Sequence, residues 1–176
     1  MRSKILMIVA QRNFRDEELK VPKEIFEKAE YSVDVASFTT EKAKGMFGLE
    51  IKPDTSIEEA IDNLEEYAVV IVVGGAGSPE LAKRPETIEL IKTAKDEYKI
   101  IGAICLGPLV LAEAGLLKNK RATVWCSQEN PEPSIEIEDK GAKYVDKKVV
   151  VDGDIITANG PEAAKEFAKQ ILKRLE

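Results

Sequence analysis

The chain has 176 residues, of which 44% are hydrophobic and 33% charged, a composition typical of one globular domain with a sizeable core. Acidic residues outnumber basic ones by 32 to 26, and no basic cluster of the kind that binds a phosphate backbone is present, so we expect no nucleic-acid partner. The sequence has neither an apolar run long enough to span a bilayer nor a cleavage signal after its first apolar segment, so we expect a cytoplasmic protein without membrane contact.

The chain contains two cysteines and no histidine. Two cysteines are too few for a disulfide framework in a chain of this length. The absence of imidazole excludes Ser-His-Asp and Cys-His catalysis from within the chain and argues against a zinc site, so we expect no metal. The prominence of Lys and Glu is typical of proteins from thermophiles.

The first half of the chain alternates predicted strands with predicted helices. Strands are predicted over residues 5–10, 32–38 and 68–73, and helices over residues 16–30, 56–64 and 84–98. The β-branched run at 68–73 is typical of a strand that is covered on both faces. Residues 45–52 are predicted to form a hairpin or a short edge strand that ends at Pro53. Ser56 and Glu59 have the spacing of a capping box.

The second half continues the same alternation. An apolar strand is predicted at 100–104 and a buried helix after it, followed by a short strand at 122–125, a loop at 129–133, a hairpin at 148–157 and a last helix that opens at 159–161. The hairpin is predicted to turn at Asp152-Gly153. This pattern predicts an α/β fold with a mostly parallel sheet and helices on both faces, as one domain over residues 1–176.

The segment 99–117 carries the strongest functional signal. An apolar strand leads into Cys105, and Gly107 and Pro108 then open a helix, which is the arrangement of a nucleophile elbow. Backbone N–H groups and the helix dipole at this place favour a thiolate over a thiol. The alternative is a buried cysteine that acts only as a small hydrophobic residue. We favour a reactive thiol at Cys105.

Glu18 is the second candidate, because of the face of the helix on which it lies. With 3.6 residues per turn, Glu18 projects into the middle of an apolar face, whereas Asp16 and Glu17 point with the polar residues. A carboxyl group held among apolar side chains has a raised pKa and can pass a proton to a neighbouring thiolate. The alternative is a solvated first-turn acid that the helix dipole favours. The apolar face comprises Leu19, Val21, Pro22, Ile25, Phe26 and Ala29.

A glycine pair and an aromatic residue complete the candidates. Gly74 and Gly75 end a core strand, so their N–H groups are candidates for holding an oxyanion, although a tight turn alone would also explain them. Ligands in such sheets bind beyond the carboxyl ends of the strands, where both this pair and Cys105 are expected. Trp125 and Cys126 are predicted at a strand end and are candidate pocket residues. For Trp125 we favour the alternative of packing, and for Cys126 we favour a spare thiol over a role in resolving an oxidised Cys105.

These residues together resemble the ThiJ/PfpI superfamily over nearly the whole chain. The matching features are the glycine pair, the Ala-Ile-Cys-x-Gly-Pro elbow, Glu18 with Pro22 in the first helix, a downstream aromatic residue, an Asp-Gly hairpin and a final Gly-Pro helix. The resemblance implies a flavodoxin-like three-layer sandwich of the glutamine-amidotransferase-like class. It also implies a nucleophilic Cys105 supported by Glu18, an oxyanion hole from the N–H groups of Gly75 and Leu106, and a homodimer or larger homo-oligomer.

The chain departs from the family pattern at several positions. Leu106 and Trp125 stand where various family members have a histidine, Val73 replaces a proline, and Asn159, a candidate pocket residue, replaces an arginine. Peptidase-type members use an acid after the glycine turn, a position that Glu80 could occupy without a histidine to orient. Proteolysis is therefore the least expected of the family's activities.

The resemblance implies three functional hypotheses. The leading one is a cofactor-independent enzyme of the glyoxalase III or deglycase type, acting on a small reactive carbonyl compound or a modified protein through Cys105 and Glu18. The second is an oxidative-stress sensor or chaperone that uses oxidation of Cys105 without turnover. The third is a binding module that has lost its catalytic activity.

Overall fold

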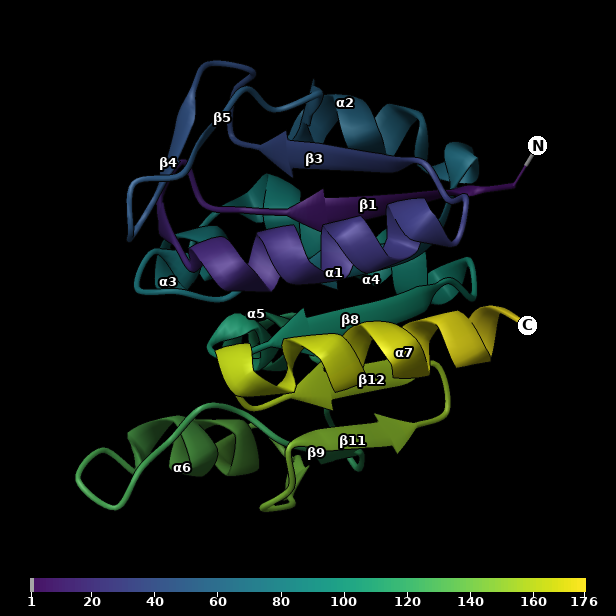
Figure 1. Ribbon diagram of the computed structural model, residues 1–176. Helices are drawn as coiled ribbons and strands as arrows, with labels where there is room; N and C mark the ends of the chain where they lie inside the picture. Colours follow the sequence, from purple (N-terminus) through teal and green to yellow (C-terminus); the bar gives the residue numbers. More distant parts are fainter. Residues whose placement is uncertain (1) are drawn as a thin grey trace.

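A seven-stranded sheet forms the centre of the molecule, as the computed structural model of residues 2–176 shows (Figure 1). In sheet order its strands are β11 (Val149–Asp152), β12 (Ile155–Ala158), β8 (Ile100–Ile104), β7 (Tyr67–Val72), β1 (Lys4–Ile8), β3 (Val33–Ser37) and β6 (Thr55–Ser56). All neighbouring strands are parallel except β11, which pairs with β12 in antiparallel register. The predicted mostly parallel sheet is confirmed.

Helices cover both faces of this sheet, which makes the predicted three-layer α/β sandwich (Figure 1). One face carries α1 (Asp16–Lys28) and α7 (Ala164–Leu175), and the other carries α2 (Ile57–Asp62), α3 (Ser78–Ala82), α4 (Pro85–Asp96) and α5 (Gly107–Glu113). Successive residues of β1 alternate between the two faces: Met7 packs in the α1 and α7 layer, and Ile8 in the opposite layer.

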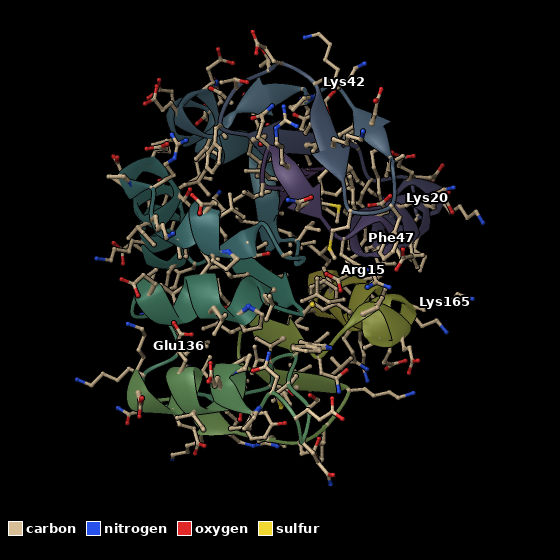
Figure 2. The ribbon with its side chains drawn as sticks, turned by 90° about the vertical axis from the view of Figure 1, so that its left-hand side faces the viewer. Arg15, Lys20, Lys42, Phe47, Glu136 and Lys165 are labelled. Atoms are coloured by element: carbon tan, nitrogen blue, oxygen red, sulfur yellow. The ribbon has the colours of Figure 1, made fainter. Side chains whose placement is uncertain are left out.

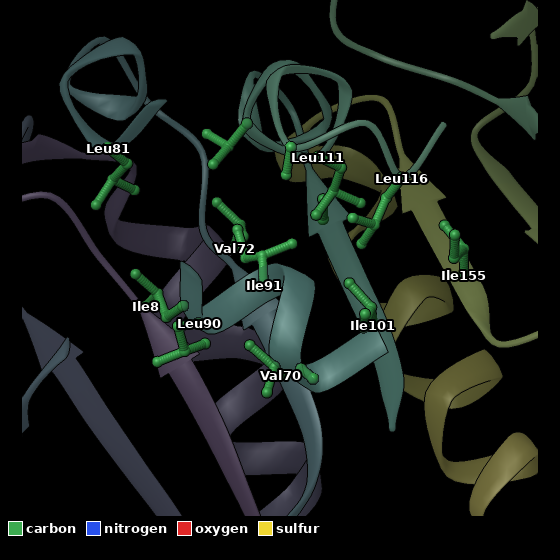
Figure 3. Close-up of a cluster of buried hydrophobic side chains, with 14 of the residues drawn as sticks. Ile8, Val70, Val72, Leu81, Leu90, Ile91, Ile101, Leu111, Leu116 and Ile155 are labelled. Atoms are coloured by element: carbon green, nitrogen blue, oxygen red, sulfur yellow. The ribbon is translucent and has the colours of Figure 1, made fainter. Parts of the chain in front are cut away.

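The central strands are held by dense apolar packing. Figure 3 shows the core beneath α4 and α5, where Leu90, Ile91 and Leu111 belong to one buried cluster with Val70 and Val72 of β7. Fully burying each side chain of this kind contributes about 1.5–3 kcal/mol. The carboxyl ends of β7 and β8, which lead to the glycine pair and to Cys105, are therefore fixed by strands whose residues are buried on both faces.

Two smaller sheets and a further helix flank the sandwich. The first small sheet consists of β2 (Arg12–Phe14), β4 (Ala43–Gly45) and β5 (Glu50–Ile51), and the second of β9 (Arg121–Ala122) and β10 (Lys143–Tyr144). The further helix is α6 (Glu132–Asp139), and short 3-10 helices lie at Leu64–Glu66 and Pro161–Ala163. The antiparallel pair β4 and β5 confirms the predicted hairpin, although it begins two residues earlier than expected.

Three predicted boundaries in the second half were wrong. The strand expected at 122–125 is limited to the two residues of β9 and lies outside the main sheet, because the Thr123 N–H donates to the Thr157 hydroxyl and the Trp125 N–H donates to the Cys105 carbonyl of the elbow. The loop expected at 129–133 already contains the first two residues of α6. The hairpin between β11 and β12 turns at Gly153-Asp154, since Asp152 pairs with Ile155 and Gly153 takes the positive φ of 62°.

Candidate functional site

Cys105 occupies a sharp turn between β8 and α5. Its φ is 62°, a left-handed conformation that is uncommon for a residue other than glycine and that often marks functional sites. The turn is fixed on both sides, because the Cys105 N–H donates to the Ala158 carbonyl at 2.9 Å and the Trp125 N–H donates to the Cys105 carbonyl at 2.8 Å. Pro108 lies in the first turn of α5, as expected. The predicted elbow geometry is present.

Glu18 lies in the first turn of α1 and is completely buried. The predicted orientation of this side chain toward the apolar interior is therefore confirmed. Among residues 2–176, neither carboxyl oxygen of Glu18 has a hydrogen-bond partner that satisfies ordinary geometry. Such a buried group is rare, because the Cys105 thiol, the Gly74 N–H and the charge of Arg15 compensate only part of its lost hydration.

Gly74 is the place where Glu18 and Cys105 meet. A Cβ atom built on Gly74 would lie 2.5 Å from the Cβ of Cys105, from Oε1 of Glu18 and from the Ile104 carbonyl oxygen. Because a real Cβ never approaches other atoms this closely, only glycine at this position lets the carboxyl group and the cysteine become close neighbours. The first glycine of the predicted pair thus has a spatial role.

The pKa of the Cys105 thiol is shifted in the opposite direction from the one that the sequence predicted. Burial raises the pKa of Glu18 to about 7. Burial, followed by the charge of Glu18, raises the pKa of Cys105 to about 12, although the N–H groups of Gly75 and Leu106 act in the opposite direction. The position of Cys105 before a helix N-terminus had predicted a favoured thiolate. That prediction was wrong on balance, because burial and the facing acid outweigh the N–H groups.

An open pocket of about 260 Å³ lies in front of the Cys105 side chain, which is 8% exposed. The wall residues are Arg15, Met46, Gly75, Ala76, Cys105, Leu106, Trp125 and Pro161. Gly75, Leu106 and Trp125 were predicted to belong to the site. The sequence did not indicate that Arg15, Met46, Ala76 and Pro161 would join them, since these residues reach the pocket from separate segments of the chain.

The environment of Asp16 in α1 differs from the predicted one. This residue was expected to point with the polar residues, but it is only 9% exposed. Its Oδ1 accepts the N–H of Phe47 at 3.2 Å, and its Oδ2 accepts the N–H of Leu49 at 2.9 Å. The hairpin of β4 and β5 covers the helix there, and its Met46 sulfur accepts the Ala76 N–H across the pocket wall at 3.4 Å.

Three other candidate residues do not contribute to this pocket wall within residues 2–176. Cys126 directs its sulfur to the Tyr144 hydroxyl at 3.2 Å, and Asn159 is fixed through its N–H on the Lys148 carbonyl. Glu80 is exposed on α3 and forms an ion pair with Lys83 at 3.2 Å.

The described chain also contains no cluster of three His, Cys, Asp or Glu residues suited to a metal ion. Across residues 2–176, no helix has both the length and the apolar character that crossing a bilayer requires.

Comparisons with known proteins show the family of the chain. The family model for the DJ-1/PfpI family matches residues 3–174. The chain belongs to the DJ-1/PfpI family. Its fold is shared with a ThiJ/PfpI domain protein from Brachyspira murdochii, which superposes with a TM-score of 0.90 at 31% identity and covers 98% of this chain and 95% of its own.

Two curated members of the DJ-1/PfpI family show which kinds of activity occur among its relatives. The glutathione-independent glyoxalase DJR-1.2 of Caenorhabditis elegans is 31% identical over 97% of this chain and 88% of its own length. The deglycase PfpI of Pyrococcus furiosus is 26% identical over 97% of this chain and 99% of its own length. Family membership therefore supports this general kind of activity.

Proposed function

We propose that this protein converts small reactive carbonyl compounds, or the adducts they form with proteins, through Cys105 and Glu18. The observation that carries the proposal is the buried, unpartnered carboxyl group of Glu18 beside a cysteine on an elbow that faces an open pocket. The names of the two curated relatives, a glyoxalase and a deglycase, support the same class of substrate.

The reactive form of the site depends on where one proton lies, on the Glu18 carboxyl group or on the Cys105 sulfur. With its pKa near 7, Glu18 binds a proton at neutral pH more readily than an ordinary carboxyl group. Once Glu18 is protonated, its charge no longer opposes ionisation of Cys105, and its O–H can donate to the sulfur. The N–H groups of Gly75 and Leu106 further stabilise the thiolate. We therefore assign the reactive state to a Cys105 thiolate beside a protonated Glu18.

The first chemical step is addition of this thiolate to an aldehyde carbon. A new S–C bond forms, and the π electrons of the carbonyl group move to its oxygen. That oxygen is stabilised by the N–H groups of Gly75 and Leu106 and takes the proton of Glu18. The product is a hemithioacetal on Cys105, and Glu18 becomes a carboxylate.

The later steps use Glu18 as a base and then as an acid. For a 2-oxoaldehyde, the Glu18 carboxylate removes the proton from the former aldehyde carbon, and an enediol forms as the ketone oxygen takes a proton from water. Glu18 then returns its proton to the second carbon while the hydroxyl group on the first carbon gives its proton back to water, which leaves a thioester of a 2-hydroxy acid on Cys105. Water hydrolyses this thioester. The first carbon is oxidised and the second is reduced, so the reaction needs no external redox partner.

Proteolysis remains disfavoured, because the chain has no imidazole to protonate an amine leaving group. Addition to an aldehyde expels no leaving group, and Glu18 titrates in the range where histidine usually does. The substrates that best suit this pair are therefore aldehydes rather than peptide bonds.

The test is formation of lactate from methylglyoxal by the purified protein. Cys105→Ser is expected to abolish turnover, whereas Cys126→Ser, a matched loss of the second thiol, is expected to retain it. No turnover by the wild-type protein, or equal turnover by the Cys105→Ser variant, would reject the proposal.

Assembly and location also belong to this proposal. We infer a homodimer or larger homo-oligomer, since the family resemblance implies self-association, and we propose that it acts in the cytoplasm. Light scattering of the purified protein measures its assembly directly, and a monomer at micromolar concentration would reject this part.

A further inference from the structure

The pocket in front of Cys105 has one formally charged side chain on its described wall, that of Arg15. The remaining wall consists of apolar side chains and backbone around the thiol. A guanidinium group keeps its charge at every physiological pH and presents a planar fork of N–H donors that matches a carboxylate. The mechanism proposed above makes no use of this group.

Arg15 is held in place from several directions. Its backbone N–H donates to the Gly74 carbonyl at 2.8 Å, which fixes its main chain against the glycine turn. Its Nε donates to the Glu17 carboxylate at 2.7 Å, and the guanidinium lies 4.6 Å from the centre of the Phe47 ring. Figure 2 shows Arg15 and Phe47 side by side. An arginine oriented in this way loses little conformational freedom when it binds a ligand.

The terminal nitrogens of Arg15 remain available for a ligand. Within residues 2–176, the hydrogen bonds and ion pairs of its side chain involve Nε alone, and the side chain is 31% exposed. The Glu17 carboxylate offsets part of the positive charge of the Arg15 guanidinium, but it accepts a hydrogen bond from Nε and not from the two Nη atoms. A ligand in the pocket would therefore find the Nη donors unoccupied.

We propose that Arg15 is a specificity-determining residue that selects ligands carrying a carboxylate next to the carbon that reacts with Cys105. The word substrate applies to these ligands only through the function proposed above, on which this inference rests. A carbonyl compound of this kind would place its carboxylate on the Nη donors while its reactive carbon faces the sulfur. Neutral carbonyl compounds of the same size would lack the first contact.

Alkylation of Cys105 tests this selectivity without requiring turnover. Iodoacetate and iodoacetamide react with a thiolate in the same way: an S–C bond forms and iodide leaves. The two reagents differ only in that the first carries a carboxylate and the second a neutral carboxamide. The measured quantity is the ratio of the two rate constants at Cys105, followed by mass spectrometry of the peptides. Cys126 in the same samples serves as an internal reference.

In the Arg15→Gln variant, the ratio at Cys105 is expected to fall roughly tenfold in favour of the neutral reagent. Arg15→Lys should retain part of the preference, since it keeps the charge but loses the fork. Lys20→Gln is the matched control: it removes a positive charge from the exposed side of α1, where Figure 2 shows Lys20 apart from Arg15, and should leave the ratio unchanged. The ratio at Cys126 should not change in any variant.

A second measurement covers the case in which Cys105 resists both reagents. Trp125 is the sole tryptophan of the chain and lines the pocket, so its fluorescence reports occupancy. Pyruvate is expected to bind more tightly than pyruvamide, with a preference that Arg15→Gln removes.

A reagent ratio or a pyruvate preference that Arg15→Gln leaves within twofold would overturn the inference. Normal methylglyoxal turnover combined with that result would leave the proposed function intact. An Arg15-dependent ratio in a protein without turnover would have the opposite meaning: the pocket selects anions, but the proposed reaction is wrong.

Discussion

Two buried acids lie two residues apart in the first turn of α1, and their surroundings differ completely. Asp16 uses both carboxylate oxygens to accept N–H groups of Phe47 and Leu49. Neither oxygen of Glu18, which is more deeply buried, has such a partner within residues 2–176. Burial alone therefore does not distinguish a structural acid from a functional one, whereas unmet hydrogen-bonding capacity does.

Each of the two acids also packs closely against a different glycine residue. A Cβ on Gly45 would collide with the Asp16 carboxylate, and a Cβ on Gly74 would collide with Glu18 and Cys105. Gly45 therefore allows the hairpin of β4 and β5 to close over Asp16, while Gly74 allows an acid and a thiol to approach each other. The two pairs provide matched variants for separating stability from chemistry.

The largest expected effect is on turnover in Glu18→Gln. An amide of the same shape carries no transferable proton, so the rate should fall roughly 10²- to 10⁴-fold. Asp16→Asn, the equivalent change in the structural acid, should keep the rate at saturating substrate within a few-fold of wild type. Steady-state assays of the two variants make the comparison, and equal losses would show that the two acids do not have separate roles.

The second effect concerns the two glycines. Gly74→Ala would place a methyl group 2.5 Å from both members of the pair, so they must separate, and turnover should fall by about 10²-fold. Gly45→Ala should mainly lower the melting temperature, because it disturbs the Asp16 contacts. Undiminished turnover in folded Gly74→Ala protein would contradict the need for close approach.

The smallest effect is on stability and has opposite signs for the two acids. Asp16→Ala should lower the free energy of unfolding by about 1–3 kcal/mol, since it strands the N–H groups of the hairpin. Glu18→Met should raise it at pH 8. The folded pKa of Glu18 is about 7 against an ordinary 4.5, so the wild type is expected to lose on the order of 2–3 kcal/mol as the pH rises through that window.

Denaturant titrations of wild-type and Glu18→Met protein between pH 4 and 8 measure this loss. The Glu18→Met variant should lack that part of the pH dependence, because no ionisable group remains at the position. Parallel curves for the two proteins would show that Glu18 ionises as readily in the folded state as in the unfolded state.

Local patterns in the sequence predicted the parts of the site that depend on one element. The apolar periodicity of α1 places Glu18 inward, and the strand-Cys-x-Gly-Pro order places Cys105 on the elbow. The same periodicity failed for Asp16, because the groups that bury and satisfy it come from a hairpin about thirty residues later. The sequence of the helix alone cannot indicate contacts with such a distant segment.

The pKa of the thiol and the pocket wall required the tertiary structure for a similar reason. Glu18 reaches Cys105 only because Gly74, in the turn that follows β7, leaves room between the two side chains. Arg15 and Met46 reach the wall from loops that no repeat or motif connects to Cys105. Likewise, the strand expected near Trp125 is wrong because that segment bonds to the elbow instead of to a neighbouring strand.

The most direct test of the account is whether Glu18 keeps its proton near neutral pH. The measurement is the infrared difference spectrum between wild type and Glu18→Gln, followed from pH 5 to pH 9 in the region of the carboxylic-acid C=O stretch. We expect a band of one protonated carboxyl group at pH 5 that disappears with a midpoint near 7. A spectrum without this band at pH 5 would mean that Glu18 is already ionised there, and the proton transfer assigned to it would be excluded.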